Sequence, residues 1–146
     1  MNRNWGYQWK NSSDPCHHCA TPNIRGFIDL RSYGQLLMYP FAHTCSVLPA
    51  HAEDLIEAAL GASKATKEVH GTKMRTGAAC ELLYHAPGSV LDWAYATAGI
   101  SFSYSVALRD TGTYGFLLPT RWIRPVGEET GALIEYLANW IFKRKL

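Results

Sequence analysis

An amphipathic stripe near the C-terminus constrains the fold of this chain more than any other feature. Apolar side chains recur there at helical spacing, at Leu133, Ile134, Leu137, Trp140 and Ile141. Such a stripe needs another element to cover it. Glu128 and Glu129 are expected at the start of this helix and the basic residues 143–145 at its end, as the helix dipole favours. The sequence therefore predicts a C-terminal helix over 128–142 that packs on the rest of the fold.

Six further segments carry strand or helix patterns. Strands are predicted at 24–30, 36–39, 74–78 and 100–108, and the last of these alternates Phe102, Tyr104 and Val106 with serines. Helices are predicted at 89–98 and after Pro49, where Leu55, Ile56, Ala59 and Leu60 recur at helical spacing behind the acidic Glu53 and Asp54. Strands and helices alternate along the chain, which is the pattern of an α/β fold.

Length and charge narrow the classes of function. The 146 residues favour one domain, with 1–23 as a loop-rich lead-in and 24–146 as the folded part. The 14 Lys and Arg residues nearly balance 12 Asp and Glu, so we expect no nucleic-acid partner. Apolar stretches are too short to span a bilayer and the first ten residues do not resemble a signal peptide, so we expect no membrane partner and leave localisation open.

Four motifs together are far more specific than composition. In chain order they are NRNW (2–5), IDLRSYGQLLMYP (28–40), LYHAPGSVLDWAY (83–95) and ALRDTGTYGFLLP (107–119). They resemble, in the same order, the second half of the catalytic domain of the zinc carboxypeptidase (funnelin, carboxypeptidase A-like) family. The segment RWIRPVGEE (121–129) is most similar to the inactive carboxypeptidase-like proteins of fungi. The resemblance covers almost the whole chain.

The resemblance implies a fold and its consequences. We expect an α/β remnant of the family's mixed eight-stranded sheet, with helices packed on the sheet, the N-terminal half missing and about four strands left. Strands that are central in the family would then become edges with unpaired backbone groups. Marginal stability, self-association through these edges or dependence on a partner would follow. Members of the family are commonly secreted or vacuolar.

The residues that the family needs for catalysis are replaced. The family holds zinc with two His and one Glu, and the zinc activates a water from which a glutamate takes the proton. The first two ligands form an HxxE motif, which the sequence does not contain. The resemblance places Arg31 at the third ligand, where a permanent cation without an acceptor cannot bind zinc, and Ala107 at the general base. It thus predicts an inactive protein without a cofactor, although intact family members bind zinc.

Several substrate-binding positions are retained. By resemblance, Asn2 and Arg3 match the pair that contacts the substrate carboxylate, and Tyr84 matches the mobile tyrosine that closes over the bound residue. Leu91 matches the floor of the side-chain pocket, where an apolar residue suits an apolar C-terminal side chain. Two interpretations follow: a module that binds peptide C-termini, or residues that persist by descent and bind nothing. The sequence alone favours the second.

The cysteines divide into two groups. The resemblance implies a disulfide between Cys45 and Cys80 in an oxidising compartment. Cys16 and Cys19 either pair with each other or stay free. Together with His18 they have the spacing of a partial zinc site, but a full site needs four ligands, so a polar loop without metal is favoured.

Two further alternatives stay open. The main alternative to an inactive protein is an active zinc-dependent carboxypeptidase that removes C-terminal apolar residues. A residual metallohydrolase that uses Cys16, His18 and Cys19 is a third hypothesis. In the RDTG turn, either Arg109 is an anion site, or Arg109 and Asp110 form an internal salt bridge or a turn-stabilising pair. The second interpretation is favoured because charged pairs in turns are usually structural.

Overall fold

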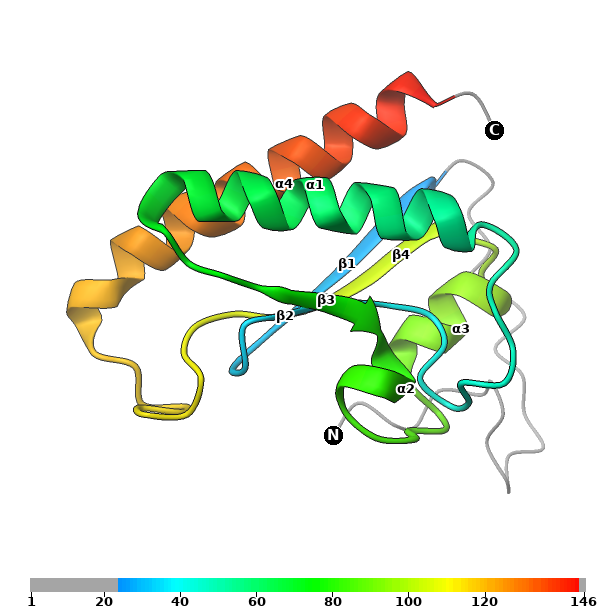
Figure 1. Ribbon diagram of the computed structural model, residues 1–146, viewed down its shortest axis with the longest axis horizontal. Helices are drawn as coiled ribbons and strands as arrows, with labels where there is room; N and C mark the ends of the chain where they lie inside the picture. The colour runs from blue at the N-terminus through cyan, green and yellow to red at the C-terminus, as the bar shows by residue number, and fades with distance from the viewer. Residues whose placement is uncertain (1–23, 145–146) are drawn as a thin grey trace.

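The computed structural model describes residues 24–144, and a four-stranded sheet forms its centre (Figure 1). The strands are β1 (Gly26–Arg31), β2 (Leu36–Tyr39), β3 (Arg75–Ala78) and β4 (Phe102–Ala107), in the spatial order β1-β4-β2-β3. β1 is parallel to β4 and β2 is parallel to β3, whereas β2 and β4 are antiparallel. The sheet is therefore mixed, and its four strands confirm those predicted from the sequence. The predicted lead-in over 1–23 lies outside the described residues.

Helices cover both faces of this sheet. The long helices α1 (Ala52–His70) and α4 (Ile123–Lys143) lie side by side on one face (Figure 1). The short helices α2 (Ala79–Leu82) and α3 (Val90–Ala96) lie on the other, and a 3₁₀ turn over Thr120–Trp122 precedes α4. Among the described helices, none is both long and apolar enough to cross a membrane. The α/β class and the mixed sheet with packed helices are confirmed.

The alternation along β4 explains why it sits inside the sheet. Phe102, Tyr104 and Val106 are fully buried against α1 and α4. Ser103 and Ser105 face the opposite layer and are also buried, where Ser103 Oγ donates a hydrogen bond to the carbonyl oxygen of Ile100 (2.8 Å). A small serine whose hydroxyl group is hydrogen-bonded in this way can be buried under a second layer at little cost in free energy. β4 is consequently buried on both faces.

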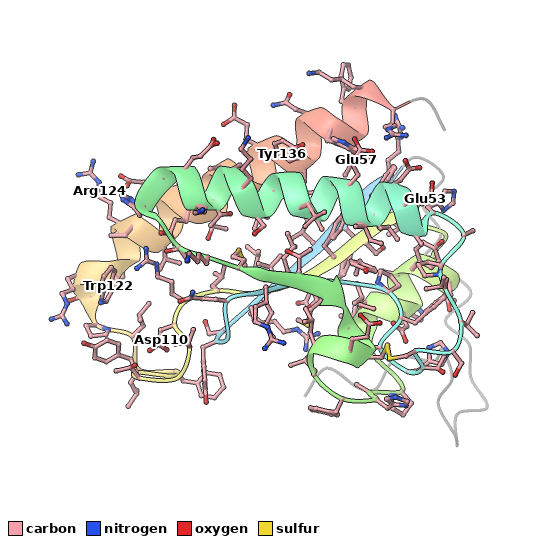
Figure 2. All side chains as sticks on the ribbon, in the orientation of Figure 1. Glu53, Glu57, Asp110, Trp122, Arg124 and Tyr136 are labelled. Carbon is pink, nitrogen blue, oxygen red and sulfur yellow. A yellow bond between two sulfur atoms is a disulfide. The ribbon has the colours of Figure 1, made fainter. Side chains whose placement is uncertain are left out.

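The buried face of α1 differs from the predicted one. Leu55 and Ala59 are fully buried as expected, but Ile56 and Leu60 are 38% and 58% exposed. The buried stripe consists instead of small residues together with Leu55, namely Ala58, Ala59, Ala62 and Thr66. The reason is the close approach of α4, because a Cβ atom on Gly61 would lie 2.0 Å from Tyr136 Oη. Figure 2 shows Tyr136 where the two helices lie together.

The C-terminal helix begins earlier than predicted. α4 starts at Ile123, so no acidic residue lies in its first turn and the predicted dipole role of Glu128 and Glu129 is wrong. Leu133, Leu137 and Ile141 form the buried stripe as expected, while Ile134 is 38% exposed. Glu129 has a different function in the fold, described below.

Candidate functional site

The sheet face opposite α1 and α4 brings together the positions that the sequence singles out. Arg31 on β1 and Ala107 on β4 are register partners, and so are Asp29 and Ser105 two residues earlier. Register partners on neighbouring parallel strands present their side chains on the same face of the sheet. The structure thus places Arg31, Asp29, Ser105 and Ala107 in one cluster.

Arg31 is held within this cluster by an acidic neighbour. Arg31 Nε forms an ion pair with Asp29 Oδ2, and Ser105 Oγ donates to the same oxygen at 3.4 Å. The side chains of Arg31 and Asp29 are 36% and 21% exposed, so the pair is neither buried nor fully solvated. The guanidinium therefore keeps an accessible edge while Asp29 compensates part of its charge.

A small hollow adjoins the guanidinium, and we call it the Arg31 hollow. Its volume is about 60 Å³, and its lining includes Arg31, Met38, Tyr84, Ser89, Leu91 and Ser105. One water needs only about 10–15 Å³ of such space, so the hollow can hold a small group of atoms. Leu91 forms a buried part of the lining at 1% exposure, whereas Tyr84 is 52% exposed. The hollow combines one cation, two hydroxyl groups from serines and an apolar wall.

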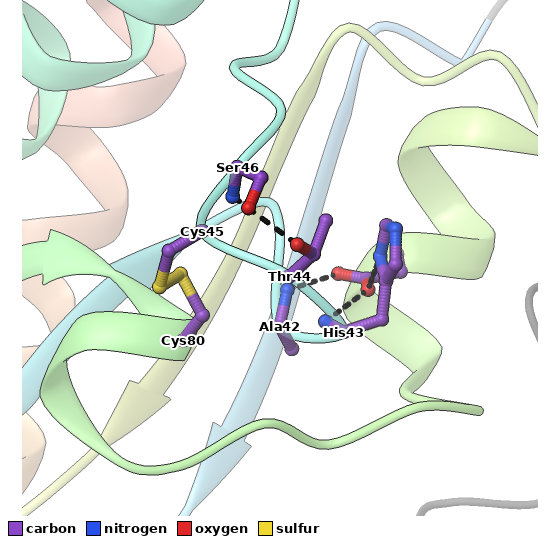
Figure 3. Close-up of a disulfide and its surroundings, with 7 residues drawn as sticks. Ala42, His43, Thr44, Cys45, Ser46 and Cys80 are labelled. Atoms are coloured by element: carbon purple, nitrogen blue, oxygen red, sulfur yellow. Dashed lines mark hydrogen bonds and ion pairs between the residues drawn. A yellow bond between two sulfur atoms is a disulfide. The ribbon is translucent and has the colours of Figure 1, made fainter.

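A buried aspartate fixes the wall of the Arg31 hollow that α3 forms. Asp92 is fully buried and accepts hydrogen bonds from the backbone nitrogens of Ala42 (2.7 Å) and His43 (2.9 Å), which follow β2. His43 Nδ1 lies 2.8 Å from Asp92 Oδ2 as well (Figure 3). These bonds join α3 to the loop after β2, so Leu91 and Ala42 keep their places beside the hollow.

The predicted disulfide closes the same region. Cys45 and Cys80 are bonded, which confirms the prediction and ties the loop after β2 to α2 (Figure 3). Two backbone hydrogen bonds run alongside, from Cys80 N to Phe41 O (3.1 Å) and from Ala86 N to Ala42 O (2.8 Å). The hollow is therefore preformed by covalent and hydrogen-bonded links rather than assembled around a ligand.

The residues present do not fit a catalytic zinc ion. Arginine offers only donors and a fixed positive charge, and the methyl group of Ala107 can neither bind a metal nor accept a proton. Within residues 24–144, no three His, Cys, Asp or Glu side chains gather so as to hold a metal ion. The weak alternative site at Cys16, His18 and Cys19 lies outside the described residues, as do the predicted substrate contacts Asn2 and Arg3.

Arg109 is engaged in a part-buried ion pair. Its Nε donates to Glu129 Oε2 at 2.8 Å, its Nη2 pairs with the other carboxylate oxygen, and its guanidinium carbon lies 4.7 Å from the ring centroid of Trp122. Thr72 Oγ1 donates to Glu129 Oε1 at 2.7 Å. The hydrogen bonds that Arg109 donates to the Glu129 carboxylate raise the pKa of Arg109. The favoured interpretation of Arg109 as part of an internal salt bridge is confirmed, with a partner in α4.

Asp110 stabilises the turn that follows. Its carboxylate accepts hydrogen bonds from the backbone nitrogens of Tyr114 (2.7 Å) and Gly115 (3.0 Å). Partial burial would raise the pKa of Asp110, but these backbone N–H groups outweigh it and hold the pKa below its usual value. The turn-stabilising prediction for Asp110 is confirmed, although Arg109 and Asp110 do not pair with each other.

Sequence reasoning missed three acidic residues of this region. Asp29 carried a usable signal, because residues two apart on a strand share a face and Arg31 therefore had an acidic neighbour. Glu129 and Asp92 carried none, since their partners are far away in the sequence.

Comparisons with known proteins all identify the same protein family. A sequence model of the zinc carboxypeptidase family matches residues 17–132. Carboxypeptidase A2 of Mus musculus is 39% identical over 152 aligned residues, which cover 88% of this chain and 36% of that protein. Inactive metallocarboxypeptidase ecm14 of Sclerotinia sclerotiorum is 36% identical over 134 residues, which cover 82% of this chain and 22% of that protein.

A solved structure shows the same fold. Bovine thrombin-activatable fibrinolysis inhibitor, in complex with tick carboxypeptidase inhibitor, superimposes with a TM-score of 0.84 and 28% sequence identity. The match covers 97% of this chain and 56% of that one. The chain spans about a third of the length of the mammalian carboxypeptidases that it resembles.

Proposed function

Because this chain belongs to the zinc carboxypeptidase family, we propose that it is a catalytically inactive member that binds peptide C-termini with an apolar last side chain. The observation that carries the proposal is the juxtaposition of Arg31 and Ala107 beside the Arg31 hollow. In an active member, the position of Arg31 would have to supply a metal ligand and the position of Ala107 a proton acceptor. Neither side chain can do so.

The loss of catalysis follows from the chemistry of these two side chains. A zinc ion, when bound in the family, polarises the scissile carbonyl and supplies an activated water. Arg31 places a permanent positive charge where a neutral imidazole would be needed, so it opposes a divalent cation. Ala107 removes the group that takes the proton, and a positioned base contributes about 10²–10⁴-fold to such reactions. Both positions lie within residues 24–144, so the proposal rests on described residues alone.

The capacity for binding rests on the part of the site that remains. Met38 and Leu91 give the Arg31 hollow an apolar wall suited to an aliphatic side chain. Tyr84 lines the same hollow and is half exposed, so it can pack against a bound residue. The hydrogen bonds of Asp92 and the disulfide keep these groups in place without a ligand. Asn2 and Arg3 are proposed, from the sequence, to contribute further contacts to the peptide.

The experiment combines turnover and binding on the whole chain. The probe is acetyl-Gly-Gly-Leu with a free carboxylate, and its C-terminal amide is the comparison. With zinc added, we expect no release of leucine over hours and saturable binding of the free acid by isothermal titration. Zinc-dependent release of leucine would establish the active carboxypeptidase instead. Absence of saturable binding of either peptide would leave a scaffold that binds no C-terminus.

A variant at Tyr84 tests whether the peptide binds in the Arg31 hollow. Tyr84→Ala removes a half-exposed ring from the lining of the Arg31 hollow and is expected to weaken binding of the free acid about tenfold. Tyr114→Ala is the matched control, because Tyr114 is also partly exposed but does not line this hollow. Equal effects of the two variants would place the peptide elsewhere.

A further inference from the structure

Arg31 has more hydrogen-bonding capacity than its recorded partner uses. A guanidinium has five N–H donors in a planar fork. Within residues 24–144, the Arg31 side chain pairs with Asp29 alone, and that contact engages Nε. The Nη groups therefore form an edge that the side-chain contacts of this part of the chain do not occupy. A solvent-accessible arginine edge of this shape matches the two oxygens of a carboxylate.

The side chains around the Nη groups of Arg31 indicate which other features a ligand should have. Arg31 lines the hollow together with Met38 and Leu91, so an anion held by the guanidinium has an apolar wall within reach. Ser89 and Ser105 line the hollow as well and provide hydroxyl groups. Ser89 Oγ already accepts from Leu91 N (3.2 Å), and Ser105 Oγ donates to Asp29 (3.4 Å). The hollow thus offers one charged contact and one apolar contact, side by side.

From these contacts we infer that Arg31 is the receptor for the ligand's carboxylate. The position that the family uses for a metal ligand has become an anion site, and the ligand is a carboxylate that carries a short aliphatic side chain. The C-terminal residue of a peptide has this chemistry. The inference rests on the proposed function, which states that peptide C-termini bind here but leaves open which described cation holds them.

Asp29 acts as an internal competitor in this arrangement. Its carboxylate already pairs with Arg31, so it lowers the positive potential that a ligand carboxylate meets. Asp29 therefore weakens the binding of a carboxylate, whereas Arg31 strengthens it. Removal of its charge should strengthen binding of an acid and leave binding of an amide unchanged, an effect that a purely structural role of the pair would not produce.

The test is a titration of the 146-residue chain and three variants with acetyl-Gly-Gly-Leu and with its amide. Arg31→Gln is expected to weaken binding of the acid at least tenfold and to leave the weak binding of the amide unchanged. Asp29→Asn is expected to tighten binding of the acid several-fold. Arg75→Gln is the matched control, because Arg75 is an exposed arginine on the same sheet face that does not line the hollow. It should bind both peptides as the parent chain does.

The outcomes separate this inference from the proposed function. If the parent chain prefers the acid and Arg31→Gln keeps that preference, Arg31 is not the receptor, while the proposed function stands. If the parent chain binds neither peptide, both fail. Circular dichroism establishes that each variant is folded. Should Arg31→Gln unfold, Asp29→Asn and Arg31→Lys decide: unchanged binding of the acid by both would overturn the inference.

Discussion

Arg31 and Ala107 are register partners at the carboxyl ends of two neighbouring parallel strands. They share one face of the sheet, and the buried side chain of Ala107 is short enough to leave Arg31 beside an open hollow. The two positions on which the proposed loss of catalysis rests therefore lie side by side in the sheet. Where the family would need a metal ligand next to a base, this chain has a cation next to a methyl group.

This juxtaposition leads to a first prediction. Ala107→Glu would place a carboxylate beside the Arg31 guanidinium, where opposite charges attract. If Arg31 receives the ligand's carboxylate, the new side chain competes with it and binding of acetyl-Gly-Gly-Leu should weaken about tenfold. Ala107→Gln has nearly the same volume without the charge and serves as the control. Equal binding by the two variants in isothermal titration would show that size alone matters there.

Much of the fold could be predicted from local pattern. The strand over 36–39 has the predicted bounds, and the alternation of Phe102, Tyr104 and Val106 identified β4. The apolar positions that predict α1 end at Leu60, and the second half of the helix, over 61–70, is polar and alanine-rich and carries no large apolar stripe. Its helicity depends on packing against α4, and tertiary packing of this kind is not visible in a local window.

The candidate site could be predicted only in part. Arg31, Ala107, Tyr84 and Leu91 came from a resemblance to a family and not from any local physical signal. The wall of the hollow depends on Asp92 bonding to residues 42 and 43, about fifty positions earlier in the chain. A local sequence pattern cannot predict a contact between residues so far apart in the chain. The hollow could therefore be identified only from the structure.

The part-buried Arg109–Glu129 pair should be important for stability. Glu129→Gln removes the charge that compensates Arg109 and leaves a poorly paired cation that is 14% exposed, which typically costs about 1–3 kcal/mol. Glu128→Gln alters a neighbouring, solvent-exposed pair with Arg124 and should change the unfolding free energy little. Urea denaturation followed by circular dichroism measures both. A similar, small loss in the two variants would contradict the structural role of Glu129.

Reduction of the disulfide should destabilise the fold. Cys45 and Cys80 are 35 residues apart in sequence, and a cross-link over such a loop typically contributes about 3–4 kcal/mol. Cys45→Ser combined with Cys80→Ser should lower the urea midpoint of unfolding, and dithiothreitol should then have no further effect. In the parent chain, dithiothreitol should reproduce most of the loss. A midpoint insensitive to both treatments would argue against the link.

Alkaline pH should weaken the core through Tyr104. Burial, and secondarily the charge of Asp54, raise the pKa of this phenol above its ordinary value near 10. The stabilisation is fully present below about pH 10 and is lost as pH rises above it, because the unfolded chain releases this proton first. Tyr104→Phe should flatten the fall in urea midpoint as pH rises above about 10. It should also lower stability at neutral pH by about 1 kcal/mol, since the hydrogen bond to Leu55 O (3.3 Å) is lost. If Tyr104→Phe leaves the fall in urea midpoint at alkaline pH unchanged, groups other than Tyr104 cause that fall.

The contact between α1 and α4 should tolerate no larger residue at Gly61. Gly61→Ala would bring a methyl group to 2.0 Å from Tyr136 Oη, and overpacking of this kind typically costs about 1–3 kcal/mol. Gly127→Ala in α4 meets nothing within 4 Å and should instead stabilise the helix by about 0.5–1 kcal/mol. Thermal melts of the two variants should therefore shift in opposite directions. A rise in melting temperature for both would show that Tyr136 moves aside freely.

The order of the strands in space has a consequence for the order of events during synthesis. Among the described strands, β1 and β2 come first in the sequence, yet both pair with β4, which lies between them and comes last. Until Phe102–Ala107 has emerged, β1 has no partner among the described strands. Contacts between residues so distant in sequence form late and slowly. The site face, with Arg31 beside Ala107, is thus completed only after Phe102–Ala107 has been synthesised.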